Sequence, residues 1–246
     1  MKQLLIFTLL CGSLALGAQD TTSYKPDIYK TNGGELIFSF ADFKNGDVDV
    51  SNVLRFSAFF HVGQKWHFDF GDHFGLFTGY GIRNIGFITK DDGVSIAAFE
   101  DQIRPGDEVK IKRRAYALGV PAAIKLGNMK RNAFVYGGAE LELLFHYKEK
   151  LFIDGKKEDK YREWFSDRTN ILSPSIFAGV QLPGGANLQV KYYLTNFLNQ
   201  SYTERAPGGG NQQPYQNVES QMFYLALSFN FRDSELSTPP AKRTEI

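Results

Sequence analysis

Histidines are the first residues to test for chemistry, because a histidine beside another histidine or a carboxylate can bind a metal or act as a base. The chain has four, at positions His61, His67, His73 and His146. Apart from the short run Trp66-His67-Phe68-Asp69, none has metal-ligand spacing to a partner on the same short element. We therefore expect no metal site and no cofactor.

A catalytic role in lipid modification would need a histidine close to a serine or a carboxylate. His146 and Glu142 lie on one expected strand face, where the rise of an extended chain separates their Cα atoms by about 13 Å. That distance is too long for a direct dyad. The sequence thus predicts no catalytic residues and no enzyme, with a lipid-modifying membrane enzyme left as a remote alternative.

Charged residues at alternate positions of otherwise apolar strands indicate a different chemistry, that of ion pairs shut inside a fold. A buried charge without a partner is very costly, so such residues should pair with one another. We predict a lumen ion-pair network made of Glu140, Glu142, Lys125, Arg113, Arg55 and Lys191.

The segment Lys148–Asn170 carries charges of both signs together with large aromatic residues. One interpretation is a solvated hairpin that extends two strands. Another is a contact surface, since Trp, Tyr and Arg are common interface anchors. The candidate contact residues are Tyr161, Arg162, Trp164 and Phe165. The cations Lys156, Lys157, Lys160 and Arg162 could equally meet lipopolysaccharide phosphates.

Composition limits the class of protein that can carry these residues. The chain has 246 residues, is 43% hydrophobic and 15% aromatic, and has a formal net charge of +1. That length suits one β-rich domain. A nearly neutral chain argues against nucleic acid as a partner. No run of about 18 apolar residues is present, so helices would not hold this chain in a membrane.

The first 18 residues have the pattern of a secretory signal peptide, with Lys2 followed by an apolar stretch and small residues. Cleavage is expected after Ala15, Gly17 or Ala18. Cys11 lies within this segment and is the only cysteine, so the mature chain has no disulfide. We expect a periplasmic lead-in over residues 19–33, a barrel over 34–231 and a polar tail over 232–246.

The stretch Gln221–Phe231, QMFYLALSFNF, alternates strictly between an apolar face and a milder one, as a β-strand does. The same period recurs upstream. The predicted strands are Gly34–Phe43, Asn52–Val62, His73–Phe87, Ile111–Leu126, Ala133–Tyr147, Ile171–Leu182, Ala186–Asn199 and Gln221–Phe231. Gly63–Asp72 is ambiguous and could be a turn followed by an early start of the third strand. Pro121 removes a ladder donor, which a bulge would accommodate.

The connections between these strands alternate in length. Those after the third, fifth and seventh strands are long and polar, whereas those after the fourth and sixth are short and rich in glycine. In an up-and-down meander, alternate connections lie at opposite ends. The pattern predicts an all-β fold, an up-and-down antiparallel transmembrane β-barrel of about 8 strands with three long external loops.

The signal segment, the strands GYGIRNIGF and RRAYALGVPAAIKLG, and the closing strand that ends in Phe231 resemble the small outer-membrane β-barrel family of the OmpA/OmpX and PorT-like kind. The resemblance covers roughly Gly34–Phe231. It implies an exported monomer in the outer membrane, with lipid as partner and a structural, surface-binding or secretion-associated role. Implied partners beyond lipid are lipopolysaccharide or a surface or secretion-machinery protein.

Period two alone does not say which face is inside. Aromatic residues near strand ends of the apolar face favour an outward apolar face, as in a membrane barrel: Phe229 and Phe231 at one rim, and Phe223, Phe145 and Tyr147 at the other. The lumen would then be plugged by polar side chains. The alternative is an exported soluble lipocalin-like carrier, whose apolar face would turn inward around a ligand.

Overall fold

The computed structural model describes residues 25–57, 62–90, 103–206 and 208–232. The expected signal peptide and nearly all of the expected tail lie outside the described residues. In the described ranges, no helix is long and apolar enough to cross a membrane.

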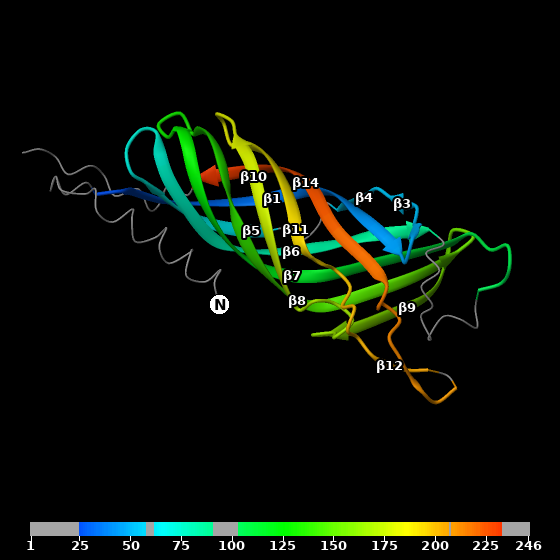
Figure 1. Cartoon of the computed structure of the whole chain (residues 1–246). Coiled ribbons are helices and arrows are strands. Elements are labelled where there is room, and N and C mark those ends of the chain that lie inside the picture. Colours follow the sequence, from blue (N-terminus) through cyan, green and yellow to red (C-terminus); the bar gives the residue numbers. More distant parts are fainter. Residues whose placement is uncertain (1–24, 58–61, 91–102, 207, 233–246) are drawn as a thin grey trace, which may run out of the picture.

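Eight antiparallel strands form a closed ring, in which each strand pairs with the next along the chain and the last pairs with the first (Figure 1). The ring strands are β1 (Asp27–Asn45), β5 (Val62–Asp69), β6 (Phe74–Lys90), β7 (Val109–Asn128), β8 (Ala133–Ile153), β10 (Leu172–Gln181), β11 (Ala186–Asn196) and β14 (Val218–Arg232). The expected up-and-down barrel is confirmed.

Among the described residues, six shorter strands lie outside this ring or extend it. They are β2 (Val48–Asp49), β3 (Asn52–Val53), β4 (Arg55–Ser57), β9 (Lys156–Trp164), β12 (Glu204–Arg205) and β13 (Asn211–Gln212). Both β4 and β5 pair with β1, so the second barrel strand continues to Asp69 instead of ending at Val62. The segment Gly63–Asp72 therefore belongs mainly to the second strand and not to the third, because its residues up to Asp69 pair with β1 on one side and with β6 on the other.

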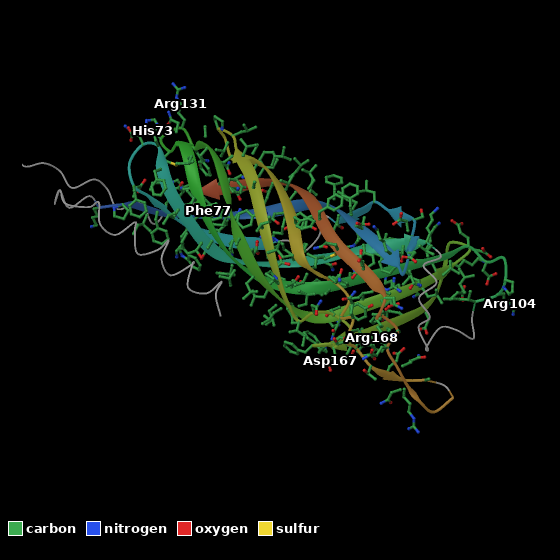
Figure 2. All side chains as sticks on the ribbon, in the orientation of Figure 1. His73, Phe77, Arg104, Arg131, Asp167 and Arg168 are labelled. Atoms are coloured by element: carbon green, nitrogen blue, oxygen red, sulfur yellow. The ribbon has the colours of Figure 1, made fainter. Side chains whose placement is uncertain are left out.

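Three short turns gather at one end of the barrel, where β1 begins and β14 ends. Figure 2 shows His73 and Arg131 from two of these turns close together at that end. The third turn has the predicted form, with the Leu182 N–H donating to the Ala186 carbonyl at 2.8 Å and Gly185 at φ 97°. The expected lead-in ends earlier than predicted. Residues from Asp27 onward belong to β1, because they pair with β5.

The opposite end carries the long connections after β6, β8 and β11, and Arg104 of the first of them marks it in Figure 2. The β1–β2 hairpin also lies there. Its Asn45-Gly46 turn was predicted, and the Gly46 N–H donates to the Asn217 carbonyl at 2.9 Å. That bond ties the hairpin to the last long connection.

The ring wall is uneven at this end. Pairing between β8 and β10 stops at Leu143 and Leu172, and beyond that point β8 pairs with β9 instead. As a result β7, β8 and β9 form a sheet that stands beyond the shorter strands β10 and β11 (Figure 1). The segment Lys148–Asn170 therefore contains a hairpin, made by β8 and β9, that extends the fifth predicted strand. Its role as a contact surface stays a prediction.

One bulge changes which side chains face inward. The β7–β8 register shifts between Tyr116 and Ala117, which lie opposite His146 and Leu144. Beyond the bulge the inward face of β8 moves from even to odd positions, so Tyr147 is buried inside. The prediction that Tyr147 faces outward was therefore wrong. No register shift occurs at Pro121, where the expected bulge is replaced by a bond from the Thr78 hydroxyl to the Pro121 carbonyl, 2.8 Å long.

Candidate functional site: the charged interior and the external sheet

The middle of the barrel interior holds a compact ion-pair cluster. Lys191 Nζ lies 2.6 Å from Glu140 Oε2 and 2.9 Å from Glu142 Oε1. Arg83 bridges Glu140 and Glu35, the latter at 3.0 Å from its Nε. Each of these charges therefore has at least one partner of opposite sign, as burial requires.

The cluster is completed by two further groups. The Tyr193 hydroxyl donates to Glu142 Oε2 at 2.7 Å. Lys65 adds a third cation inside the barrel, with its Nζ 5.5 Å from the ring centre of the buried Phe77. Three carboxylates thus face three cations. Hydrogen bonds from the tyrosine and the guanidinium use carboxylate lone pairs that the lysine does not reach.

Glycine makes room for this cluster. Gly119 pairs with Glu142 across the β7–β8 ladder, and a Cβ at Gly119 would collide with the Glu140 carboxylate. The expected neighbours were Gly119 for Glu140 and Ala117 for Glu142. In the observed register, Glu142 lies opposite Gly119 and Glu140 lies opposite Pro121, so each partner is two residues away from the expected one. The space expected for the two carboxylates is nevertheless supplied by β7.

A second cluster lies nearer the short turns. Lys125 pairs with Asp69, and its ammonium also donates to the Tyr29 hydroxyl and to His67 Nδ1, at 3.2 Å each. Since Nδ1 accepts, the proton of the neutral imidazole is on Nε2, which donates to Thr31 Oγ1 at 2.9 Å. The Tyr29 ring stacks on His67 at 4.6 Å.

A third cluster lies toward the long connections. The Arg113 guanidinium faces Glu149 at 3.8 Å, and the Tyr147 hydroxyl donates to the same carboxylate. Arg55 donates to the Asn84 carbonyl at 3.0 Å and to the Asn84 side chain.

The six residues predicted to form one network are all buried, but they do not meet at one place. Only Glu140, Glu142 and Lys191 come together. Lys125 and Arg113 are on the same strand, β7, and the rise of a strand puts them ~40 Å apart along it. The single network is therefore corrected to separate clusters at different heights.

Sequence reasoning missed the partners that complete these clusters, which are Arg83, Glu35, Asp69, Glu149 and Tyr193. Each occupies the inward parity of its strand. A signal was available for Arg83, which is the lone charge in the strand GYGIRNIGF.

Apolar layers fill the interior above and below the central cluster. Toward the short turns lie Phe77, Ala123, Met129, Phe134, Tyr136 and Phe177. Toward the long connections lies a larger group that includes Phe43, Phe87, Tyr147, Phe197 and Tyr215. The expectation that polar side chains alone plug the lumen needs this correction: aromatic rings fill much of it.

The outer surface of the ring has the opposite character. Leu141 and Val190 are 50% and 53% exposed, whereas their strand neighbours Glu140 and Lys191 are 3% and 2% exposed. Phe229 and Phe231 are also exposed near the end of β14. Apolar side chains therefore face out along the wall, and charged ones face in.

His146 and Glu142, the pair considered for catalysis, lie on opposite sides of the wall. Glu142 is held inside by Lys191 and Tyr193. His146 is turned outward by the bulge and stacks on Trp164, with ring centroids 4.5 Å apart. The described residues contain no group of three or more metal-ligating side chains.

The four candidate contact residues of the external hairpin divide into two kinds. Arg162, Trp164 and Phe165 are exposed. Tyr161 points to the inner side of β9, where its ring lies under Arg168, 5.0 Å from the guanidinium carbon.

Arg168, labelled in Figure 2, joins the connection that follows β9 to the one that follows β11, whose Phe197 and Tyr215 pack against the barrel interior. Its guanidinium donates to Tyr215 at 3.1 Å and to Glu204 at 2.6 Å, and lies 4.7 Å from the Tyr202 ring centre. Burial raises the pKa of Tyr202 to about 12. The same cause, burial, raises the pKa of Tyr215. These connections form a packed cover.

These features define a closed, internally filled antiparallel barrel with an apolar exterior. No protein-family model matches the chain, and no curated protein matches its sequence. Among solved structures, the chain is similar to Ail, the attachment invasion locus protein of Yersinia pestis, solved with the heparin analogue sucrose octasulfate. The TM-score is 0.34 and the identity 11%, over 84% of this chain and 99% of that one.

Two other solved barrels are similar to a comparable extent. Neisserial surface protein A matches with a TM-score of 0.31 and 11% identity, over 83% of this chain and 97% of that one. The outer membrane protein OprG from Pseudomonas aeruginosa matches with a TM-score of 0.32 and 10% identity, over 86% of this chain and 99% of that one.

Proposed function

We propose that this chain is an exported outer-membrane barrel with a structural or surface-binding role and no catalytic activity. The observation that carries the proposal is the polarity of the wall, with Leu141 and Val190 outside and Glu140 and Lys191 inside. A soluble carrier would bury the first pair around its ligand and expose the second. Contiguous apolar surface on this scale suits lipid and not water.

The height of the apolar band supports the membrane location. On β7 the outward residues from Tyr116 to Leu126 carry no charge. The strand rises ~34 Å over the span from Tyr116 to Leu126, or ~24 Å measured across a bilayer at a tilt of about 45°. That height is close to the ~25 Å apolar band of membrane barrels.

Aromatic residues border this band. Tyr116, His146 and Trp164 form a stacked row on the side of the long connections. Phe70 and Phe74 lie at the other end, with ring centroids 6.0 Å apart. Aromatic rings of this kind favour the level of lipid headgroups.

The filled interior favours a role in binding at the surface over conduction. The central ion pairs and the aromatic layers on both sides of them occupy the lumen. We infer that the long connections and the external sheet make the contacts. The partners proposed are outer-membrane lipid, including lipopolysaccharide, and a surface or secretion-machinery protein, with the barrel itself a monomer.

Fractionation of cells that export the full chain tests this function. We expect recovery in the outer-membrane fraction, resistance to alkaline carbonate extraction, and faster gel migration before heating than after it. Recovery in the soluble periplasm would contradict the proposal.

A further inference from the structure

Two rows of cations occupy the outward face of the external β7–β8–β9 sheet. The row nearer the barrel, called the lower row, is Arg114, Lys148 and Arg162. The row further from it, called the upper row, is Lys112, Lys150 and Lys160. Within each row, the residues on neighbouring strands are direct partners in the ladder. Side chains from adjoining strands project to the same side at such positions, so six positive charges share one small surface.

Charge on these strands is sorted by face. In Lys148-Glu149-Lys150 the two lysines face outward, while Glu149 faces inward toward Arg113. In the part of the chain that the structure describes, none of the six cations is within ion-pair distance of a carboxylate. Lys110, two residues beyond Lys112 on β7, does have an acidic partner: its Nζ lies 3.0 Å from Glu108 Oε1.

Like charges placed directly opposite each other on a sheet are destabilising. The consequence is visible at the centre of the surface. Burial, followed by the charges of neighbouring cations, lowers the pKa of both Lys148 and Lys150. The Nε of Arg114 is buried and has no hydrogen-bond partner among the described residues. An anion bound between the rows would remove this repulsion.

The position of the rows indicates where such an anion would come from. An aromatic row lies beside the lower row on the same outward face, two residues closer to the apolar band along each strand. It consists of Tyr116, His146 and Trp164. Their rings are stacked, with 5.8 Å between Tyr116 and His146. Aromatic rows mark the level of the membrane interface, so the cations lie at the height of lipid headgroups and face the lipid.

We propose that the two rows bind the phosphate groups of a multiply phosphorylated glycolipid of the outer leaflet, the chemistry of a lipopolysaccharide headgroup. The proposal rests on the membrane location proposed above. The rows are ~7 Å apart along the strands and neighbouring cations ~5 Å apart across them, so two phosphates can each meet several cations. Arg114 and Arg162 offer bidentate donors, and the lysines add point charges.

Binding of a diphosphorylated glycolipid to the full-length protein in a neutral detergent tests the site. The variant Arg114→Gln/Lys148→Gln/Arg162→Gln removes the lower row. The matched control, Lys25→Gln/Lys130→Gln/Arg131→Gln, removes as many cations from exposed positions at the opposite end of the barrel. We expect the lower-row variant to lose about tenfold or more in affinity and the control to bind as the native chain does.

Two further arms identify the source of the phosphate. The same glycolipid after enzymatic dephosphorylation should bind the native chain as weakly as the intact lipid binds the variant. Inorganic phosphate should fail to displace the intact lipid at low millimolar concentration. Equal binding by native and variant chains, insensitivity to dephosphorylation, or displacement by inorganic phosphate would each overturn the proposal.

A last comparison separates this site from the membrane function. Both variants and the native chain are refolded into vesicles of neutral phosphatidylcholine, and heat-modifiable migration reports the inserted barrel. We expect all three to insert, since the six cations take no part in closing the ring. Failure of the native chain to insert contradicts the barrel function itself, whereas insertion with unchanged glycolipid binding in the variant contradicts only the phosphate site.

Discussion

Lys191 and Glu140 lie on strands that flank β10 and meet inside the barrel, where the lysine Nζ is 2.6 Å from the carboxylate. Their strand neighbours Val190 and Leu141 are half exposed on the outer wall. One step along each strand thus exchanges a buried charge for an exposed apolar side chain. That exchange links the strand pattern, the filled interior and the membrane location.

Replacing Lys191 with methionine should strongly destabilise the barrel. The change removes one of the cations that Glu140 and Glu142 share, beside Arg83, and leaves a buried negative charge in excess. Breaking a buried pair on one side costs about 3–5 kcal/mol. Urea unfolding of the protein in micelles measures the loss. Lys44→Met, at a partly exposed cation, is the control and should change stability by less than about 1 kcal/mol.

The double variant Lys191→Met/Glu142→Gln should recover part of that loss, because it also removes one carboxylate and with it the excess negative charge. A Lys191→Met barrel as stable as the native one would show that the cluster does not hold the interior together.

Gly119→Ala should destabilise the protein by about 1–3 kcal/mol, because the new Cβ meets the Glu140 carboxylate and must displace it. Gly137→Ala is a matched control on the next strand. The Cβ there has only the Phe177 carbonyl oxygen nearby, at 3.7 Å. Thermal unfolding of both variants in the same detergent makes the comparison. Equal stability of the two would mean that the cluster tolerates a shift of Glu140.

Arg168→Ala should loosen the two external connections and leave the barrel intact. The guanidinium donates to Tyr215 and Glu204 and covers Tyr202, so its loss separates these groups. We expect faster amide exchange and proteolysis within residues 197–217, with unchanged heat-modifiable migration. Arg205→Ala, at an exposed position of β12, is the control and should leave both rates unaltered.

Alkali should open the same cover. Burial raises the pKa of Tyr202 to about 12, above its ordinary value of about 10. A raised pKa means that folding favours the neutral phenol, so this contribution to stability is complete below pH ~10 and is lost as the pH rises through about 12. Proteolysis of the 197–217 connection against pH, with Tyr202→Phe for comparison, measures the effect. Opening of the native cover well below pH ~10 would contradict this assignment.

The sequence was sufficient for much of the fold because the signal is local. Strict alternation in Gln221–Phe231 predicted β14, and the unequal connections predicted which turns share an end. The bulge in β8 carries no such signal. Leu144, Phe145 and Tyr147 are all apolar or aromatic, so either parity looks acceptable, and only pairing with β7 decides that Tyr147 turns inward.

Partner choice inside the barrel depends on tertiary register, which a single sequence does not contain. Lys125 and Asp69 are far apart in the chain and meet because β5 and β7 both flank β6. The alternation along the strand predicted that Lys125 faces inward. It did not predict how far along the barrel axis Lys125 lies from the other buried charges. For the same reason, the six predicted residues were assigned to one network when they occupy several.

Nitroxide labels on single cysteines give the most direct test of the wall's polarity, because the only native cysteine, Cys11, lies in the expected signal peptide. Labels at Leu141 and Val190 of the refolded barrel in lipid vesicles should be relaxed strongly by oxygen and weakly by a water-soluble nickel chelate. A label at the exposed loop residue Asp167 should show the reverse. Strong nickel relaxation at both Leu141 and Val190 would contradict a lipid-facing wall.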